Sequence, residues 1–123
     1  MPLYTVTTQA GNLSPEAKSG LAAELTRFHS DYAGVPEDWV KVVFHDYPPG
    51  NAFSAGKPSP IVTLTLLIRT GRPPEYKRGL VTRLWQLLQS ATGAPDDRIV
   101  IGVQEVPPSQ AMEMGQIMPE VAG

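Results

Sequence analysis

The second residue of the chain is a proline, which lies directly behind the initiator methionine and could supply a reactive amine. If Met1 is removed, the Pro2 nitrogen becomes a terminal secondary amine, and chain-terminal amines titrate near pH ~7.7–8.0. Such a group can act as a general base or acid close to neutral pH. If Met1 is retained, the nitrogen is an amide without usable basicity. Met-Pro beginnings also occur without any chemical role, so Pro2 alone does not define a site.

Two arginines form a second candidate group. Arg69 ends the apolar run 61–68, and Arg72 follows it just before a predicted helix. Two guanidinium groups at a strand end beside a helix N-terminus can bind a carboxylate or a phosphate. The alternative is a pair of solvated arginines at a strand end. An amine beside a carboxylate-binding pair would outline an active site for a small acid.

A histidine and a glutamate complete the candidates. His29 lies on the apolar face of a predicted helix, where a buried core histidine is the alternative to a ligand-binding one. Glu113 lies between Met112 and Met114, and a carboxylate in apolar surroundings is costly unless it is paired or used; a glutamate that points to water is the alternative. Because His29 and His45 have no acidic partner at ligand spacing, the sequence predicts no metal site and no cofactor.

The composition limits the remaining classes. The chain has 123 residues, with no cysteine, 13 prolines, 11 glycines and a net charge of −2. This length predicts a single domain that spans residues 1–123. The lack of cysteine excludes disulfides and thiolate chemistry and fits a reducing cytoplasm. Short apolar runs and the absence of a signal pattern argue against a membrane partner. A pI of about 5.6 argues against a nucleic-acid partner. We therefore expect a cytoplasmic protein.

The chain contains an internal repeat. A shift of 59 residues aligns 14–49 with 73–108 without a gap. The identical pairs are Pro15/Pro74, Glu16/Glu75, Lys18/Lys77, Gly20/Gly79, Leu21/Leu80, Leu25/Leu84, Gly34/Gly93, Pro36/Pro95, Asp38/Asp97, Pro48/Pro107 and Pro49/Pro108. We interpret this as two copies of one unit, about 2–49 and 61–108, followed by a C-terminal tail, 109–123. The same shift places Pro2 opposite Ile61.

Each unit is predicted to form a strand, a helix and a second strand. The predicted strands are 3–9, 40–44, 61–68 and 99–103, and the predicted helices start at Ser14 and near Pro74 and stop at Gly34 and Gly93. The linker 50–60 is predicted to be flexible, and the tail to hold at most one helical turn.

These units predict an α/β (α+β) fold. A strand–helix–strand unit closes as a right-handed crossover with parallel strands. If the two units join through antiparallel first strands, they give a four-stranded mixed sheet with both helices on one face, and Pro2 then lies near Arg69. The run 61–68 is expected to be apolar on both faces, so the open sheet face should pack against other copies. We expect a homotrimer with C3 symmetry.

Together these residues resemble the tautomerase superfamily, most closely the branch of cis-3-chloroacrylic acid dehalogenase and its homologues. The resemblance covers most of the chain. Its motifs are Pro2 behind Met1, Leu13-Ser-Pro-x-Ala-Lys18, His29, Pro49-Gly-Asn-x-Phe53, Arg69-Thr-Gly-Arg72, Glu105-Val-Pro107 and Gln110-x-Met-Glu113-x-Gly115. The resemblance implies that Pro2 is the catalytic proline, that His29, Arg69 and Arg72 bind the substrate carboxylate, and that Glu113 positions or activates water.

One residue departs from that pattern. Where the dehalogenase has a tyrosine that helps the glutamate activate water, this chain has Gly102, which supplies no hydroxyl. Tyr4, Tyr32 and Tyr47 are candidates to replace it.

Three functions follow as hypotheses. The first is a tautomerase of small 2-oxo or 2-hydroxy unsaturated acids that uses Pro2 as general base and acid. The second is a cofactor-independent hydrolytic dehalogenase or hydratase of cis-3-haloacrylate-type acids that uses Pro2 and Glu113. The third is a non-catalytic oligomeric module that binds small acids or takes part in signalling.

Overall fold

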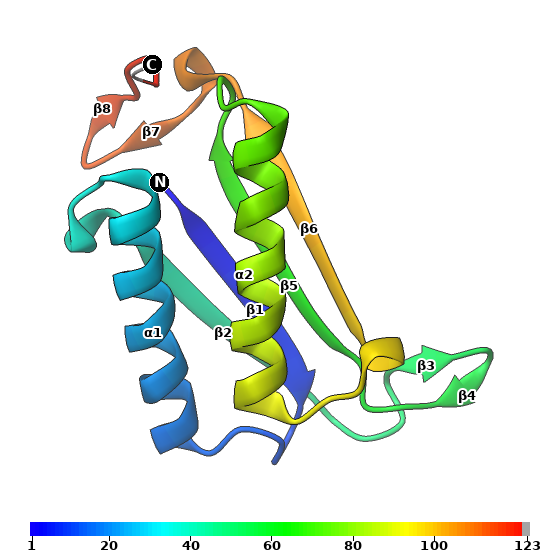
Figure 1. The fold of residues 1–123 in the computed structure, drawn as a ribbon. Helices are drawn as coiled ribbons and strands as arrows, with labels where there is room; N and C mark the ends of the chain where they lie inside the picture. The colour runs from blue at the N-terminus through cyan, green and yellow to red at the C-terminus, as the bar shows by residue number, and fades with distance from the viewer. Residues whose placement is uncertain (122–123) are drawn as a thin grey trace.

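The computed structural model describes residues 1–121 and consists of two layers, a four-stranded sheet and two helices packed on one of its faces (Figure 1). The sheet order is β2-β1-β5-β6, with β1 parallel to β2, β5 parallel to β6, and β1 antiparallel to β5. The elements of the two units are β1 (Leu3–Gln9), α1 (Pro15–Ala33), β2 (Lys41–Tyr47), β5 (Val62–Arg69), α2 (Pro74–Thr92) and β6 (Ile99–Val106). This architecture confirms the fold class predicted from the repeat.

The helix ends follow from local sequence. The Oγ of Ser14 accepts a hydrogen bond from the Ala17 amide at 3.1 Å, which satisfies a free amide at the start of α1. Gly34 ends α1 with a φ of 69°, and Gly93 ends α2 with the same value. Both glycines adopt a left-handed conformation that other residues adopt only at a cost. The single turns Glu37–Trp39 and Asp96–Arg98 then lead into the second strands.

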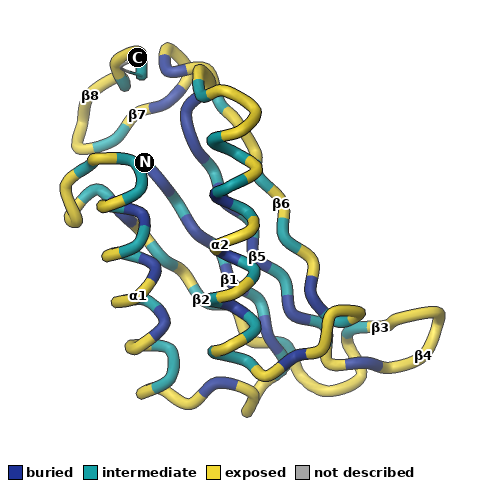
Figure 2. The backbone as a smooth tube through the Cα atoms, viewed as in Figure 1, coloured by how far each residue is buried: buried dark blue, intermediate teal, exposed yellow. Residues whose placement is uncertain are grey.

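The core lies between the sheet and the helices, and buried residues alternate with less buried ones along β1 and β5 (Figure 2). The buried apolar residues are Tyr4, Val6, Leu13, Leu21, Leu25, Val40, Val62, Leu64, Leu66, Ile68, Leu80, Leu84, Leu88, Ala94 and Ile99. The expectation that 61–68 is apolar on both faces was only partly right. The open face of β5 carries Thr63, Thr65 and Leu67, because the strand alternates side chains between its faces.

The repeat is exact in the helices and second strands but shifted in the first strands. Lys18 pairs with Asp46 at 2.7 Å, and the equivalent Lys77 pairs with Glu105 at 2.9 Å. In β1 and β5, however, the even-numbered residues face the core in both strands. The repeat shift of 59 is an odd number, so it would place the core residues of one strand opposite the outward-facing residues of the other. The predicted match of Pro2 with Ile61 is therefore wrong by one residue. The connection before α1 is one residue longer than the connection before α2, which absorbs the difference.

Two short hairpins replace segments predicted as irregular. The linker 50–60 contains β3 (Phe53–Ser54) and β4 (Lys57–Pro58), and the tail contains the turn Pro108–Gln110 followed by β7 (Met112–Glu113) and β8 (Gln116–Ile117). Residues 122 and 123 of the predicted tail lie outside the described residues. None of the helices described is long and apolar enough to cross a bilayer.

Candidate active site

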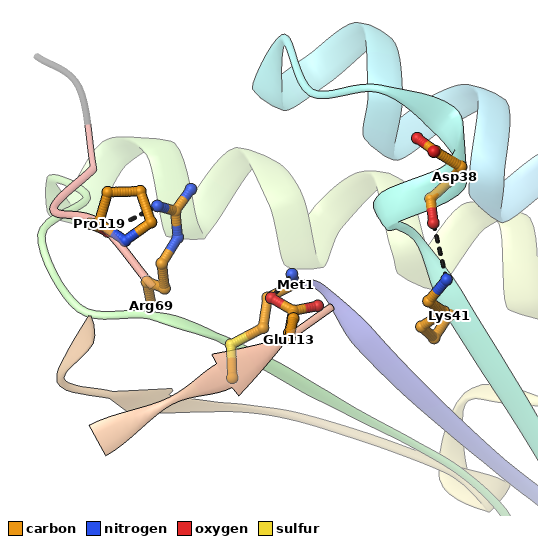
Figure 3. Close-up of polar contacts among 6 residues, drawn as sticks. All are labelled: Met1, Asp38, Lys41, Arg69, Glu113 and Pro119. Atoms are coloured by element: carbon orange, nitrogen blue, oxygen red, sulfur yellow. Dashed lines mark hydrogen bonds and ion pairs between the residues drawn. The ribbon is translucent and has the colours of Figure 1, made fainter. Parts of the chain in front are cut away.

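The N-terminus lies at the end of the sheet that also carries the β7–β8 hairpin and the end of the described chain (Figure 1). Here the amine of Met1 donates to Oε2 of Glu113 and forms an ion pair with it (Figure 3). Met114 and Gly115, between β7 and β8, have φ values of 53° and 74°, the signature of a two-residue turn with positive φ at both positions. That tight turn places Glu113 on a strand facing the N-terminus.

A small cavity at this end of the sheet collects the remaining candidates. Its walls include Met1, His29, Arg69 and Arg72. Pro2 is fully buried, and its carbonyl accepts a hydrogen bond from the Lys41 amide at 3.1 Å, so the start of β1 is held in the sheet. The cavity volume is about 20 Å³, room for about one water molecule with Met1 in place. The cavity thus brings together His29, Arg69 and Arg72. Pro2 and Glu113 are not among its lining residues: Pro2 follows Met1 in the chain, and Glu113 is paired with the Met1 amine.

The end of the chain covers Arg69. This arginine is buried, and its Nη1 donates to the Pro119 carbonyl at 2.7 Å (Figure 3). Val121 lines the cavity, and its Cγ2 would clash with a Cβ atom on Gly71. Gly71 also has a φ of 126°. A glycine is therefore required between the two arginines for two reasons, the backbone conformation and the close approach of the tail.

Sequence reasoning missed Tyr76 as a wall of the cavity. The guanidinium of Arg72 lies 4.8 Å from the centre of the Tyr76 ring, a cation–π contact that orients the arginine. Tyr32 donates a hydrogen bond from its hydroxyl to the Tyr76 carbonyl at 2.8 Å, which fixes the first turn of α2 to α1. Because Tyr76 lies four residues after Arg72, at the start of a predicted helix, their proximity was available from the sequence.

His29 is buried on α1 and neutral at ordinary pH. Burial, together with the positive charges of Arg72 and the N-terminal amine, lowers its pKa to about 4. Its Nδ1 lies 2.6 Å from the Tyr4 hydroxyl on β1, and the two rings meet edge to face. His29 is therefore both a core residue and a wall of the cavity.

The hydroxyls of the three tyrosines proposed to replace the one missing at Gly102 are engaged in hydrogen bonds of their own. Tyr47 donates to the Ile61 carbonyl at 2.5 Å, at the opposite end of β1. The hydroxyls of Tyr32 and Tyr4 bond to Tyr76 and His29, as described above. Gly102 lies on the open face of β6, away from the helices. Within the described chain, Tyr76 is the tyrosine that lines the cavity.

The opposite end of the sheet provides an internal comparison. The repeat places Leu88 where the first unit has His29, and Leu13 where the second unit has Arg72, and both leucines are buried. A hollow of about 460 Å³ at that end has Arg98 as its charged lining residue. The charged and polar set is thus confined to one of two pseudo-equivalent sites. A larger hollow of about 510 Å³ between α1 and α2 is lined by helix surface residues and excludes the N-terminus.

Among residues 1–121, no cluster of three or more acidic, histidine or cysteine side chains is placed to hold a metal ion. The chemistry that the cavity offers comes from its amine, imidazole, guanidinium and carboxylate groups. Such groups can bind a small anion and move a proton on it.

Comparison with known proteins shows the family to which the chain belongs. The model of a family described as putative oxalocrotonate tautomerase enzyme matches residues 1–123. The chain therefore belongs to the tautomerase superfamily. Within it, the chain belongs to the branch of cis-3-chloroacrylic acid dehalogenase-like proteins, as the second of the structures below indicates.

Three solved structures illustrate the relationship. Native Ps01740 is 32% identical, with a TM-score of 0.86 over 90% of this chain and 99% of its own. N1, a member of the cis-3-chloroacrylic acid dehalogenase family, is 30% identical, with a TM-score of 0.90 over 97% of this chain and 85% of its own. Wild-type Q0 fused 4-OT, a symmetric trimer, is 20% identical and shares the fold, with a TM-score of 0.85 over 94% of each chain. No curated protein sequence matches the chain.

Proposed function

We propose that this protein is a tautomerase of small 2-oxo and 2-hydroxy unsaturated acids, with the amine of Pro2 as its general base and acid. The observation that carries the proposal is the cavity at the start of β1, where Arg69 and Arg72 lie beside the N-terminus. The repeat-equivalent end of the sheet lacks this charged set. The proposal requires removal of Met1, which frees the Pro2 nitrogen and vacates the space that Met1 fills.

In the proposed reaction, the two arginines bind the substrate carboxylate and the neighbouring oxygen at C2. Their charge stabilises the enolate that develops at that oxygen, which is the largest source of barrier reduction in such sites. The neutral amine of Pro2 takes the proton from the enol oxygen and returns it to carbon, so that the enol becomes the 2-oxo acid with no net gain or loss of atoms. Burial of the site in a small cavity strengthens these interactions.

Ketonisation of phenylpyruvate enol and of 2-hydroxymuconate tests the proposal. We expect turnover by the native protein and a loss of about 10²- to 10⁴-fold for Pro2→Ala with Met1 removed, the range that a general base contributes. Pro60→Ala is the matched control, because Pro60 is exposed at the opposite end of the sheet. Wild-type activity in Pro2→Ala, with Met1 shown to be absent by mass, would exclude this mechanism. Binding of the acids without turnover would favour the non-catalytic alternative.

A second function is favoured by the position of Glu113 beside the N-terminus. In it, protonated Pro2 gives its proton to C2 of a cis-3-haloacrylate, while Glu113 directs water to C3, and the resulting halohydrin loses hydrogen halide. N1, one of the similar structures, is named as a member of the cis-3-chloroacrylic acid dehalogenase family. Halide release that disappears in Glu113→Gln would support this function, and tautomerase activity without halide release would reject it.

We also propose that the chain acts as a homotrimer, as Q0 fused 4-OT is named a symmetric trimer. Val43 on β2 and Val100 on β6 face away from the helices and are 43% and 62% exposed. Their burial between sheets would recover the free energy lost by exposing apolar surface to water. Native mass spectrometry should give three times the chain mass, and Val43→Glu should dissociate the assembly, whereas a monomeric wild type would overturn the proposal.

A further inference from the structure

The hydrogen bond between Tyr4 and His29 joins β1 to α1 directly behind the cavity. The Tyr4 side chain is completely buried, and its hydroxyl oxygen lies 2.6 Å from Nδ1 of His29. The rings are 5.5 Å apart at an angle of 83°. This geometry fixes the orientation of the imidazole as well as its depth in the core.

The protonation states decide which group donates. Burial raises the pKa of the Tyr4 phenol above its ordinary value, so the phenol keeps its proton. Burial also keeps His29 neutral, with one protonated and one unprotonated ring nitrogen. If Nδ1 carried the proton, the Tyr4 hydroxyl would accept, and its own hydrogen would have no partner among the described residues. A buried donor without a partner costs about 1–3 kcal/mol. Tyr4 therefore donates, and Nδ1 accepts.

The other ring nitrogen then carries the proton and is available to a ligand. Within residues 1–121, one fully buried side-chain polar atom has no hydrogen-bond partner, and it is the Oγ of Ser59. The Nε2 of His29 also has no partner there but is not among the fully buried atoms. It is therefore accessible to open space. His29 lines the cavity with Arg69 and Arg72. The N–H of Nε2 is thus placed to donate into the same space as the two arginines.

We propose that Tyr4 is a positioning residue that holds His29 in the Nε2–H tautomer, so that His29 is a neutral hydrogen-bond donor to an oxygen of the bound acid. The identity of the ligand rests on the proposed function. A neutral donor adds a directed hydrogen bond to the acid without a third cation beside two arginines. Without the Tyr4 hydroxyl, both tautomers become available, and the Nδ1–H form turns a lone pair toward the oxygen of the acid.

The experiment compares Tyr4→Phe with Tyr47→Phe, a matched control whose hydroxyl bonds at the opposite end of β1. Long-range ¹H–¹⁵N NMR of the His29 ring in the free protein gives the tautomer without any assay of activity. We expect a pure Nε2–H pattern in the wild type and in Tyr47→Phe, and a mixed pattern in Tyr4→Phe. An Nδ1–H pattern in the wild type, or an unchanged pattern in Tyr4→Phe, would overturn the proposal. The wild-type spectrum decides the point even if Tyr4→Phe fails to fold.

Binding of phenylpyruvate, measured by titration calorimetry, tests the role toward the ligand. We expect Tyr4→Phe to weaken binding about 10-fold, the effect of losing one hydrogen bond of about 1.4 kcal/mol, and Tyr47→Phe to leave it unchanged. Equal affinities in the three proteins would overturn the positioning role. Failure of the proposed function has a different signature, namely no turnover by the wild type while the tautomer and binding differences persist.

Discussion

The amine of Met1 forms an ion pair with the carboxylate of Glu113, which lies 112 residues further along the chain. Met1 therefore holds the position next to the acidic group and the arginines that a reactive amine would need. Its removal would leave Pro2 at the chain end in the same neighbourhood. Removal of one residue would thus replace the primary amine of Met1 with the secondary amine of Pro2 and open the space that Met1 occupies.

The first prediction concerns Met1 itself. Protein made while methionine aminopeptidase is inhibited should retain Met1, because the aminopeptidase is what removes it, and intact mass verifies this. In that form the Pro2 nitrogen is an amide, so we expect tautomerase activity at least about 100-fold below that of the processed protein. Treatment with purified aminopeptidase should restore both the mass and the activity. Full activity in the form that retains Met1 would contradict the proposed base.

The second prediction concerns the two arginines. Arg69→Lys and Arg72→Lys keep the charge but lose the planar fork that binds two oxygens at once, and Arg72→Lys also weakens the contact with Tyr76. A charge-assisted hydrogen bond contributes about 1.5–3 kcal/mol, so kcat/KM should fall about 10- to 100-fold in each variant. Arg98→Lys, at the opposite end of the sheet, is the control. Steady-state kinetics that left all three variants equal would argue that the acid binds elsewhere.

Much of the fold could be predicted from the sequence, because helix caps, alternation and the repeat are local signals. Ser14 and Gly34 are examples, since each acts through neighbours a few residues away. The proximity of Pro2 to Arg69 could also be predicted, because it follows from antiparallel pairing of β1 with β5. Proximity of residues could thus be predicted where the sheet topology alone determines it.

The rest depends on contacts that no local pattern encodes. The β7–β8 turn uses Met114 at positive φ, a conformation for which methionine gives no sequence signal. The contact of Arg69 with the Pro119 carbonyl joins residues 50 positions apart through a main-chain atom, which any residue type could supply. The one-residue shift between β1 and β5 follows from loop length, and a gapless repeat cannot represent it.

The third prediction concerns stability at acid pH. The pKa of His29 is about 4 in the folded protein and 6.5 in the unfolded chain. Between these values the unfolded chain binds more protons, so stability falls as the pH drops from about 6.5 to about 4 and loses no more through this group below that range. A difference of about 2.5 pH units corresponds to about 3 kcal/mol.

Urea unfolding from pH 7 to pH 4 measures this loss. His29→Gln removes the titrating group. Over the same pH range, the loss in its free energy of unfolding should be about 3 kcal/mol smaller than the loss in the wild type. Parallel stability curves for the wild type and His29→Gln would show that His29 is not held neutral by the fold.

The last prediction uses two glycines that occupy equivalent positions in the repeat. Gly20 lies within α1 with no atom within 4 Å of an added Cβ, whereas a Cβ on Gly79 would lie 2.5 Å from the Tyr32 hydroxyl. Gly20→Ala should therefore stabilise the protein by about 0.5–1 kcal/mol, through the higher helix propensity of alanine. Gly79→Ala gains the same propensity but displaces Tyr32 from the Tyr76 carbonyl, so we expect a net loss of about 1–3 kcal/mol.

The two substitutions also separate stability from function. Tyr76 packs against Arg72 at the cavity, so displacement of Tyr32 should disturb substrate binding, and KM should rise in Gly79→Ala but not in Gly20→Ala. Tyr32→Phe in the Gly79→Ala background removes the clashing hydroxyl and should recover part of the lost stability, because the alanine methyl then has room. Thermal unfolding and kinetics of the four proteins check this. Equal effects of the two alanines would mean that the contact between α1 and α2 does not determine the shape of the cavity.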